Sequence, residues 1–157
     1  MRISILKTFL TVFLVFKITF INAKDFALVS SHEFKNLKVR TALDKKSKQI
    51  GLMNVKKIKD YDGMLFLYSE PIKVSIWMQN TIIPLDVIFI DERKKISSIQ
   101  NGIPYSTKLL SSSVNVVAVL EIPRGCSKKL KIKIGDQINW ILKKKEKLKI
   151  LHIIIVN

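Results

Sequence analysis

Short apolar runs, rich in β-branched and aromatic residues, recur along the chain and are separated by turn residues. Runs of this length and composition predict β-strands. The strands are expected over residues 26–30, 37–43, 63–68, 74–78, 85–90, 95–100, 114–122, 135–142 and 148–157. Two short helical segments are also expected, one over residues 44–53 with Asp44 as its N-cap and one over residues 127–132.

This succession of segments predicts a mainly β fold, a single-domain β-barrel or jelly-roll-like sandwich with one or two short helices. A parallel α/β fold is excluded, because no long amphipathic helix alternates with the strands. We expect the domain to occupy residues 24–142 and residues 143–157 to form a C-terminal extension that adds a strand.

The first 23 residues have the character of a secretory leader. Arg2 and Lys7 precede an apolar run of nine residues, and Lys17 interrupts the apolar character before the small residue Ala23. The run is shorter than the roughly 20 apolar residues that span a bilayer. We therefore expect a signal peptide cleaved after Ala23 and a periplasmic or secreted protein, with an uncleaved membrane anchor as the alternative.

The formal net charge of +16 falls to +13 without the three basic residues of the leader. The lysines are scattered, and aromatic residues do not alternate with them as they do in proteins that stack nucleic-acid bases. We therefore expect no nucleic-acid partner. The basic composition is interpreted mainly as drift toward A+T-rich codons, with attraction to an anionic envelope surface as a secondary consequence.

Metal, cofactor and disulfide chemistry find little support in the sequence. Cys126 is the only cysteine, so it cannot form an internal disulfide and is interpreted as a small core residue. His32 and His152 are too far apart in the sequence to suggest a zinc site or a triad. We expect no cofactor or metal. Three methionines are interpreted as core residues rather than copper ligands: Met53, Met64 and Met78.

Polar residues interrupt the apolar pattern in two of the expected strands. In the strand over 85–90, Asp86 shares a face with isoleucines, and in the strand over 114–122, Glu121 shares a face with valines. Each acid lies near a strand end, where loops can reach it. We hypothesise a polar pocket shared by the two acids, with the following ligand-binding residues: Trp77 as an apolar wall, Asn80, Thr81, Asp86 and Glu121.

A purely structural interpretation of the same residues remains open. Asp86 would then accept backbone N–H groups from the loop over 80–84, and Glu121 would pair with a lysine. Gly135 and Asp136 are expected to form a tight turn, in which the glycine allows a positive φ and the aspartate bonds its own loop.

Five motifs resemble those of a known family, "domain of unknown function 192": GLM at 51–53, DGMLF at 62–66, WMQNTIIPLDVIF at 77–89, VLEIPRG at 119–125 and GD at 135–136. The resemblance covers about residues 37–141, and the block around WM-x-NT-x-x-PLD is the most specific part. It implies a compact β-rich domain that is often exported in bacteria. It implies no established activity.

The sequence departs from the family pattern around the GLM motif. Members carry an arginine about three residues before GLM and an aromatic residue followed by an arginine just after it. Here the corresponding positions hold Lys48, Asn54 and Val55. Lysine does not replace the bidentate geometry of arginine, so an anion site that depends on those arginines would be altered.

Three functions are compatible with these residues. The one we favour is an exported envelope protein that binds a small polar ligand or glycan in the pocket without catalysis. The second is a hydrolase that uses Asp86 and Glu121 as an acid–base pair, which requires the two carboxyls to lie within about 10 Å of each other in an open cleft. The third is a structural or interaction role in the envelope, through the strand over 148–157 as an unpaired edge.

Overall fold

The computed structural model describes residues 14–20, 25–144 and 149–155. The chain divides into two compact units. The larger unit comprises Lys24–Lys145, and the smaller unit contains the two terminal segments.

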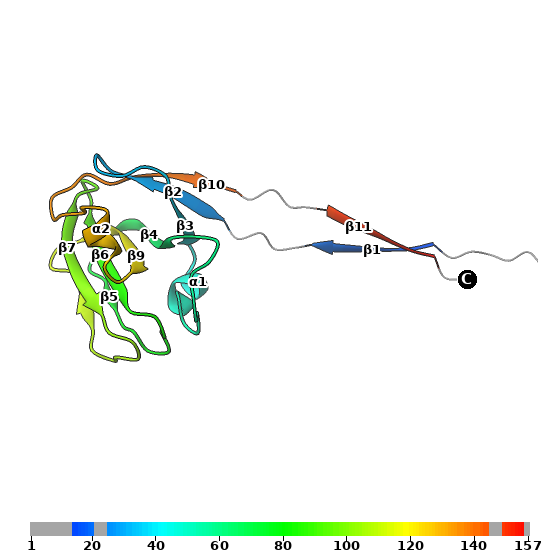
Figure 1. Cartoon of the computed structure of the whole chain (residues 1–157), viewed down its shortest axis with the longest axis horizontal. Helices are drawn as coiled ribbons and strands as arrows, with labels where there is room; N and C mark the ends of the chain where they lie inside the picture. Colours follow the sequence, from blue (N-terminus) through cyan, green and yellow to red (C-terminus); the bar gives the residue numbers. More distant parts are fainter. Residues whose placement is uncertain (1–13, 21–24, 145–148, 156–157) are drawn as a thin grey trace, which may run out of the picture. The chain divides into compact units, whose positions relative to one another are not determined.

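A twisted seven-stranded sheet forms the larger unit (Figure 1). In spatial order its strands are β10 (Asn139–Lys143), β2 (Phe26–Ser30), β3 (Leu37–Ala42), β4 (Gly63–Ile72), β9 (Val116–Pro123), β6 (Leu85–Asp91) and β7 (Ile96–Gly102). Only the β3–β4 pair is parallel, and the other pairs are antiparallel. A separate two-stranded ribbon pairs β5 (Ser75–Ile76) with β8 (Leu110–Ser111).

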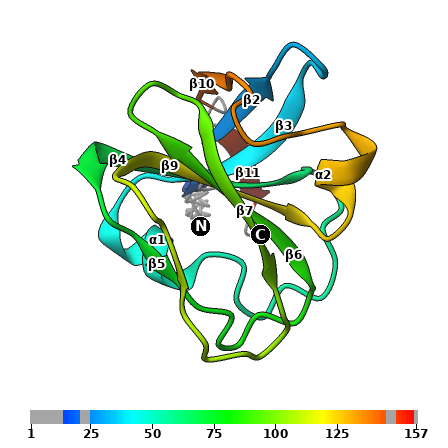
Figure 2. The ribbon, with the colours of Figure 1, turned by 90° about the vertical axis from the view of Figure 1, so that its left-hand side faces the viewer.

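The two edges of the sheet approach each other before β10 begins. Residues 135–138 bond to residues 94–96 through the Gly135, Ile96 and Ile138 amides, and Lys95 forms an isolated antiparallel bridge with Gln137. Figure 2 shows the strong twist of the strands that brings these segments together. Within the described residues β10 and β7 remain the edge strands, so the sheet curls without closing into a barrel.

Alternation along the central strands divides the apolar side chains between the two faces of the sheet. We call these faces the Leu120 face and the Val119 face, after adjacent residues of β9 that point to opposite sides. The buried Leu120 face includes Leu65, Ile88, Ile90, Ala118, Leu120 and Ile122. The buried Val119 face includes Met64, Phe66, Leu85, Val87, Phe89 and Val119.

Different segments cover the two faces. Cys126 and Leu130, in and after the short helix α2 (Cys126–Lys129), pack against the Leu120 face. The Val119 face packs against Leu52, against residues 55–61 and against the segment that contains Val74 and Met78. The helix α1 (Lys45–Ile50) precedes Leu52 and brings that segment onto this face.

The short helix α1 is fixed at both ends by its own sequence. The Asp44 carboxylate accepts a hydrogen bond from the Ser47 amide at 2.8 Å, and the Ser47 hydroxyl accepts one from the Asp44 amide at 3.2 Å. Reciprocal bonds of this kind satisfy amides that have no partner inside the helix. Gly51 ends the helix with a φ of 48°, and its amide donates to the Ser47 carbonyl.

The smaller unit contains one antiparallel pair. The strand β1 (Leu14–Phe20) pairs with β11 (Lys149–Ile155) along all seven residues of each strand. Much of the expected leader, including Ala23 and the cleavage point, lies outside the described residues. Among the described residues, none of the helices has the length and apolar character needed to cross a membrane.

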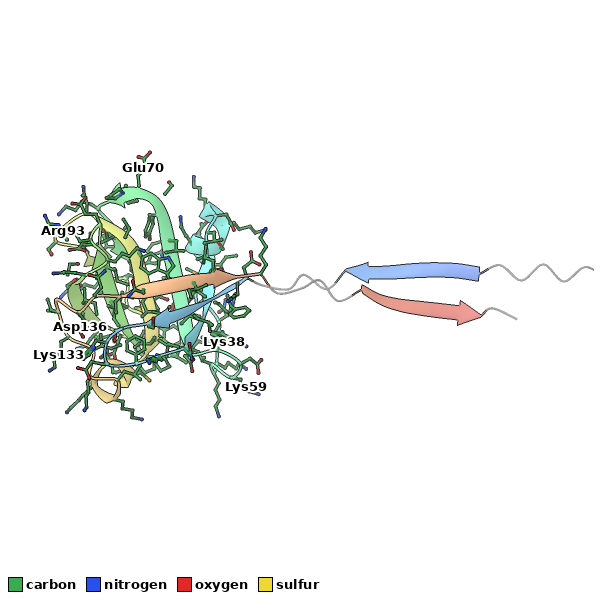
Figure 3. The ribbon with its side chains drawn as sticks, turned by 90° about the horizontal axis from the view of Figure 1, so that it is seen from above. Lys38, Lys59, Glu70, Arg93, Lys133 and Asp136 are labelled. Atoms are coloured by element: carbon green, nitrogen blue, oxygen red, sulfur yellow. The ribbon has the colours of Figure 1, made fainter. Side chains whose placement is uncertain are left out.

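The mainly β, sandwich-like prediction with two short helices is confirmed. The glycine–aspartate turn is also confirmed, because Gly135 has a φ of 92° and the Asp136 carboxylate accepts the Lys133 amide at 2.8 Å. Figure 3 shows Lys133 and Asp136 close together at the surface. The expected strand over 74–78 is shorter than predicted, since only Ser75–Ile76 is paired.

Candidate functional site

Glu121 on β9 is a buried carboxylic acid with 4% of its surface exposed. It lies on the Val119 face, with Met64 of β4 as its register partner on one side and Val87 of β6 on the other. Burial raises the pKa of this carboxyl from 4.5 to about 8. Burial is the sole cause of the shift, so neither a donor nor a positive charge among the described residues compensates the ionised form.

The carboxyl of Glu121 lines a pocket of about 220 Å³. Residues 48–53, from the end of α1 and the segment after it, form one wall. Phe66 and Tyr68 of β4 form a second wall, and the segment that contains Trp77 and Thr81 forms a third. A cavity with apolar and aromatic walls and few polar groups is the common form of a small-molecule site.

Tyr68 and Lys48 are the other ionisable groups that line this pocket. Burial, and then the nearby charge of Glu121, raises the pKa of the Tyr68 hydroxyl to about 12. The ammonium of Lys48 lies 4.6 Å from the centroid of the Tyr68 ring, within the range of a cation–π contact. The pocket therefore offers a buried carboxyl, a neutral phenol and a cation held against an aromatic ring.

Two of the predicted residues from the segment 77–81 line the pocket, and one does not. Trp77 is 47% exposed and forms part of the wall, and the buried Thr81 also lines it. Asn80 is exposed and lies outside the lining. Its φ is 57°, and its carbonyl accepts the Asn54 amide at 2.8 Å, so Asn80 shapes the turn that carries Trp77 and Thr81.

Asp86 on β6 holds the turn that leads into α2. Its Oδ2 atom accepts hydrogen bonds from the Gly125 amide at 3.0 Å, the Ser127 amide at 3.0 Å and the Ser127 hydroxyl at 2.6 Å. These donors satisfy a carboxylate that is only 4% exposed. The structural interpretation, in which Asp86 accepts backbone N–H groups of a loop, is thus confirmed. The loop that it named is wrong, because the donors come from residues 125–127 rather than 80–84.

The expected niche shared by Asp86 and Glu121 is wrong. Asp86 is the register partner of Ile122, and Val87 is the partner of Glu121. Partners in an antiparallel pair point to the same face, and neighbours along a strand point to opposite faces. Asp86 therefore lies on the Leu120 face and Glu121 on the Val119 face, so the sheet separates them and they cannot act as an acid–base pair in one cleft.

The alternative that Glu121 pairs with a lysine is also not observed among the described residues, since no charge lowers the pKa of its carboxyl. Sequence reasoning missed Tyr68, whose aromatic ring adjoins both Lys48 and the acid. The sequence does place Tyr68 on the same face of β4 as Met64 and Phe66, because the three residues lie two positions apart. Only the pairing of Met64 with Glu121, which the sequence does not give, shows that this face contains the acid.

A second and larger pocket, of about 360 Å³, lies beside α2 and is lined by Ile122, Cys126 and Leu130 among others. Its charged lining residues, Lys59, Asp62 and Lys129, are all exposed, so it lacks the buried acid that distinguishes the pocket around Glu121. Among the described residues no group of three or more histidine, cysteine, aspartate or glutamate side chains could hold a metal ion.

The family described as "DUF192: Uncharacterized ACR" matches residues 27–140. A Novosphingobium aromaticivorans protein of unknown function is 33% identical, with a TM-score of 0.64 over 73% of this chain and 84% of that one. A Sinorhizobium meliloti protein described as a candidate transcription regulator is 32% identical, with a TM-score of 0.67 over 75% of this chain and 94% of that one. No curated protein matches the chain.

Proposed function

The chain belongs to the uncharacterised family "domain of unknown function 192", and we propose that it binds a small polar ligand, such as one sugar of a glycan, in the pocket around Glu121. The observation that carries this proposal is the position of Glu121. A buried carboxyl without a compensating partner opens into a pocket of about 220 Å³. Burying such a group costs free energy unless a ligand or water completes its hydrogen bonds.

The walls of the pocket suit a small ligand with both polar and apolar surface. Trp77 and Tyr68 offer aromatic surfaces, and Thr81 and Glu121 offer hydrogen-bonding groups. The volume is below the roughly 300–1,000 Å³ of pockets that hold drug-sized ligands. A single sugar ring, an amino acid or a small amine therefore fits the site better than an extended polymer.

Binding can be tested with the fluorescence of Trp77. The chain has two tryptophans, so the Trp140→Phe variant leaves Trp77 as the only one. This variant is titrated with glucose, N-acetylglucosamine, glycine and choline, and thermal unfolding is followed in parallel. We expect at least one compound to change the Trp77 emission saturably and to raise the Tm. If none does so at millimolar concentration, the proposal fails.

Export is the second part of the proposal. The support for it is the leader-like composition of residues 1–23. Mass spectrometry of the protein recovered from the envelope or culture medium of its host tests it. The expected mass is that of a chain beginning at Lys24, and an intact chain confined to the cytoplasm would contradict the proposal.

A structural role through the C-terminal strand is the second candidate function. It is favoured by the pairing of β11 with β1, because cleavage after Ala23 would remove β1 and leave β11 without that partner. An unpaired strand can add to a sheet of another protein. The chain 24–157 should then recover a partner from envelope extracts, and the chain 24–147 should not. Equal recovery by both chains would count against this function.

A further inference from the structure

Among the described residues, no positive charge stabilises the ionised form of Glu121. Lys48 lines the same pocket, but its ammonium lies against the Tyr68 ring, and burial is the only cause of the raised pKa of Glu121. Arg40 of β3 lies beyond Met64 on the same face, and its guanidinium lies 5.3 Å from the centroid of the Tyr61 ring. Among the described residues, the lysine that lines the pocket and the arginine on the same face of the sheet thus each lie against an aromatic ring.

The walls around Glu121 have the aromatic character that attracts cations. Trp77, whose ring type gives the strongest cation–π interaction, is half-exposed in the pocket wall. The contact of Lys48 with Tyr68 shows that the ring of Tyr68, another lining residue, already accepts an ammonium group. A carboxyl that shares a pocket with aromatic rings can recognise an alkylammonium group by charge and by ring contact together.

We infer that the ligand of this pocket carries an ammonium group, which lies between the Glu121 carboxylate and the rings of Trp77 and Tyr68. This inference rests on the proposed function and specifies the chemical class of its ligand. Small amines, choline-like compounds and amino sugars belong to that class. An anionic ligand is disfavoured above pH 8, because its charge would then lie against the ionised carboxylate of Glu121.

Proton release is the signature of such binding. A cationic ligand stabilises the ionised form of Glu121, so the carboxyl loses its proton as the ligand binds. Affinity should therefore rise with pH up to about 8, the pKa of Glu121 in the free protein. Among the described residues, the other charged or titratable groups of the pocket lining are Tyr68 from β4 and Lys48 from α1, and Arg40 of β3 lies on the same face of the sheet, beyond Met64. The pKa of Tyr68 is about 12, above this range.

Choline and its uncharged isostere 3,3-dimethyl-1-butanol provide a matched pair of probes. Choline keeps its charge at every pH, so any change in its affinity reports a group of the protein. In the Trp140→Phe protein, choline should bind at least about tenfold more tightly at pH 9 than at pH 6.5. The isostere should bind weakly and equally at both pH values. The Glu121→Gln change should remove the pH dependence, and Lys48→Gln should tighten choline binding.

Each other outcome identifies what has failed. If glucose or N-acetylglucosamine binds and choline does not, the inference about the ammonium group is wrong and the proposed function stands. If choline and its isostere bind equally at both pH values, the pocket is an apolar site and the inference is wrong. If no compound binds, both the inference and the proposed function fail. The pH series in the Trp140→Phe protein needs no substitution at Glu121, so a folding defect in the Glu121→Gln variant would not mask the result.

Discussion

Asp86 and Glu121 lie on neighbouring strands, one step apart in register, and point to opposite faces of the sheet. Asp86 pairs with Ile122 and ties down the turn into α2. Glu121 pairs with Val87 and opens into the pocket between α1, β4 and the segment around Trp77. Two acids that look equivalent in the sequence therefore have different surroundings: Asp86 is bonded within a turn, and Glu121 lines a pocket.

Removing the Asp86 carboxylate should destabilise the protein without changing the pocket. Asp86→Ala deletes the acceptor of three hydrogen bonds and leaves the Gly125 and Ser127 donors without it, which should cost about 2–4 kcal/mol in the free energy of unfolding. Ser127→Ala, which removes one donor, should cost about 1 kcal/mol. Urea unfolding measures both values. If the Asp86→Ala protein folds but no longer binds a pocket ligand, the structural role assigned to Asp86 is contradicted.

Glu121 should make stability depend on pH. Below pH 4.5 the carboxyl is protonated in the folded and the unfolded chain, and above about 8 it is ionised in both. Between these values only the folded chain keeps the proton, so the free energy of unfolding falls as the pH rises. The fall should be of the order of 3–5 kcal/mol, as an upper estimate from the size of the pKa shift.

Urea unfolding of the wild type and of Glu121→Gln at pH 5 and pH 8.5 measures this contribution. The variant should gain stability relative to the wild type as the pH rises, because glutamine does not ionise. Glu70→Gln serves as the matched control, since Glu70 is exposed and projects from the surface in Figure 3. The same pH dependence in all three proteins would show that Glu121 is not its source.

Trp77 should matter for binding and little for stability. Its ring is half-exposed in the pocket wall, so Trp77→Ala should change the free energy of unfolding by less than about 1 kcal/mol. The same change should weaken the binding of a pocket ligand about five- to thirtyfold, since a ring contact of this kind is worth about 1–2 kcal/mol. Isothermal titration calorimetry measures the affinity. Trp140→Phe is the control and should leave it unchanged.

Gly63 allows β4 to approach β9 at the level of Glu121. A Cβ atom at this position would lie 2.1 Å from the Glu121 carbonyl oxygen, so Gly63→Ala requires the two strands to separate. The cost should exceed about 2 kcal/mol. Gly135→Ala is the matched control, because its Cβ would meet no atom within 4 Å and only the positive φ of 92° would be strained. Equal losses in the two variants would contradict this explanation.

The fold was largely predictable because its signals are local. Strand alternation in 85–90 and 114–122 assigned each side chain to the correct face of its own strand, and Asp44 and Gly51 marked the ends of α1. The prediction failed where two strands had to be aligned. Alternation does not say whether Asp86 lies opposite Ile122 or Glu121, and a change of one residue moves a side chain to the other face.

The pocket was predictable only in part for the same reason. The sequence identified Trp77, Thr81 and Glu121 as candidate site residues. It did not identify the other parts of the pocket wall, which come from α1 and from Tyr68 of β4. These elements are brought together by the parallel β3–β4 pair and by the pairing of β4 with β9, which are long-range features. The sequence predicted that Asn80 donates hydrogen bonds to a ligand. Its positive φ instead shows that Asn80 shapes the turn before β6.

The protonation state of Glu121 in the free protein is the most direct test of the proposed ligand site. Carbon-13 NMR of glutamate labelled at the side-chain carboxyl follows each acid through a pH titration, and comparison with Glu121→Gln identifies the resonance. Glu121 should titrate with a midpoint near pH 8. A midpoint near 4.5, the ordinary value, would mean that the carboxyl is hydrated or already paired, and the pocket would then lack the group on which the proposed ligand binding depends.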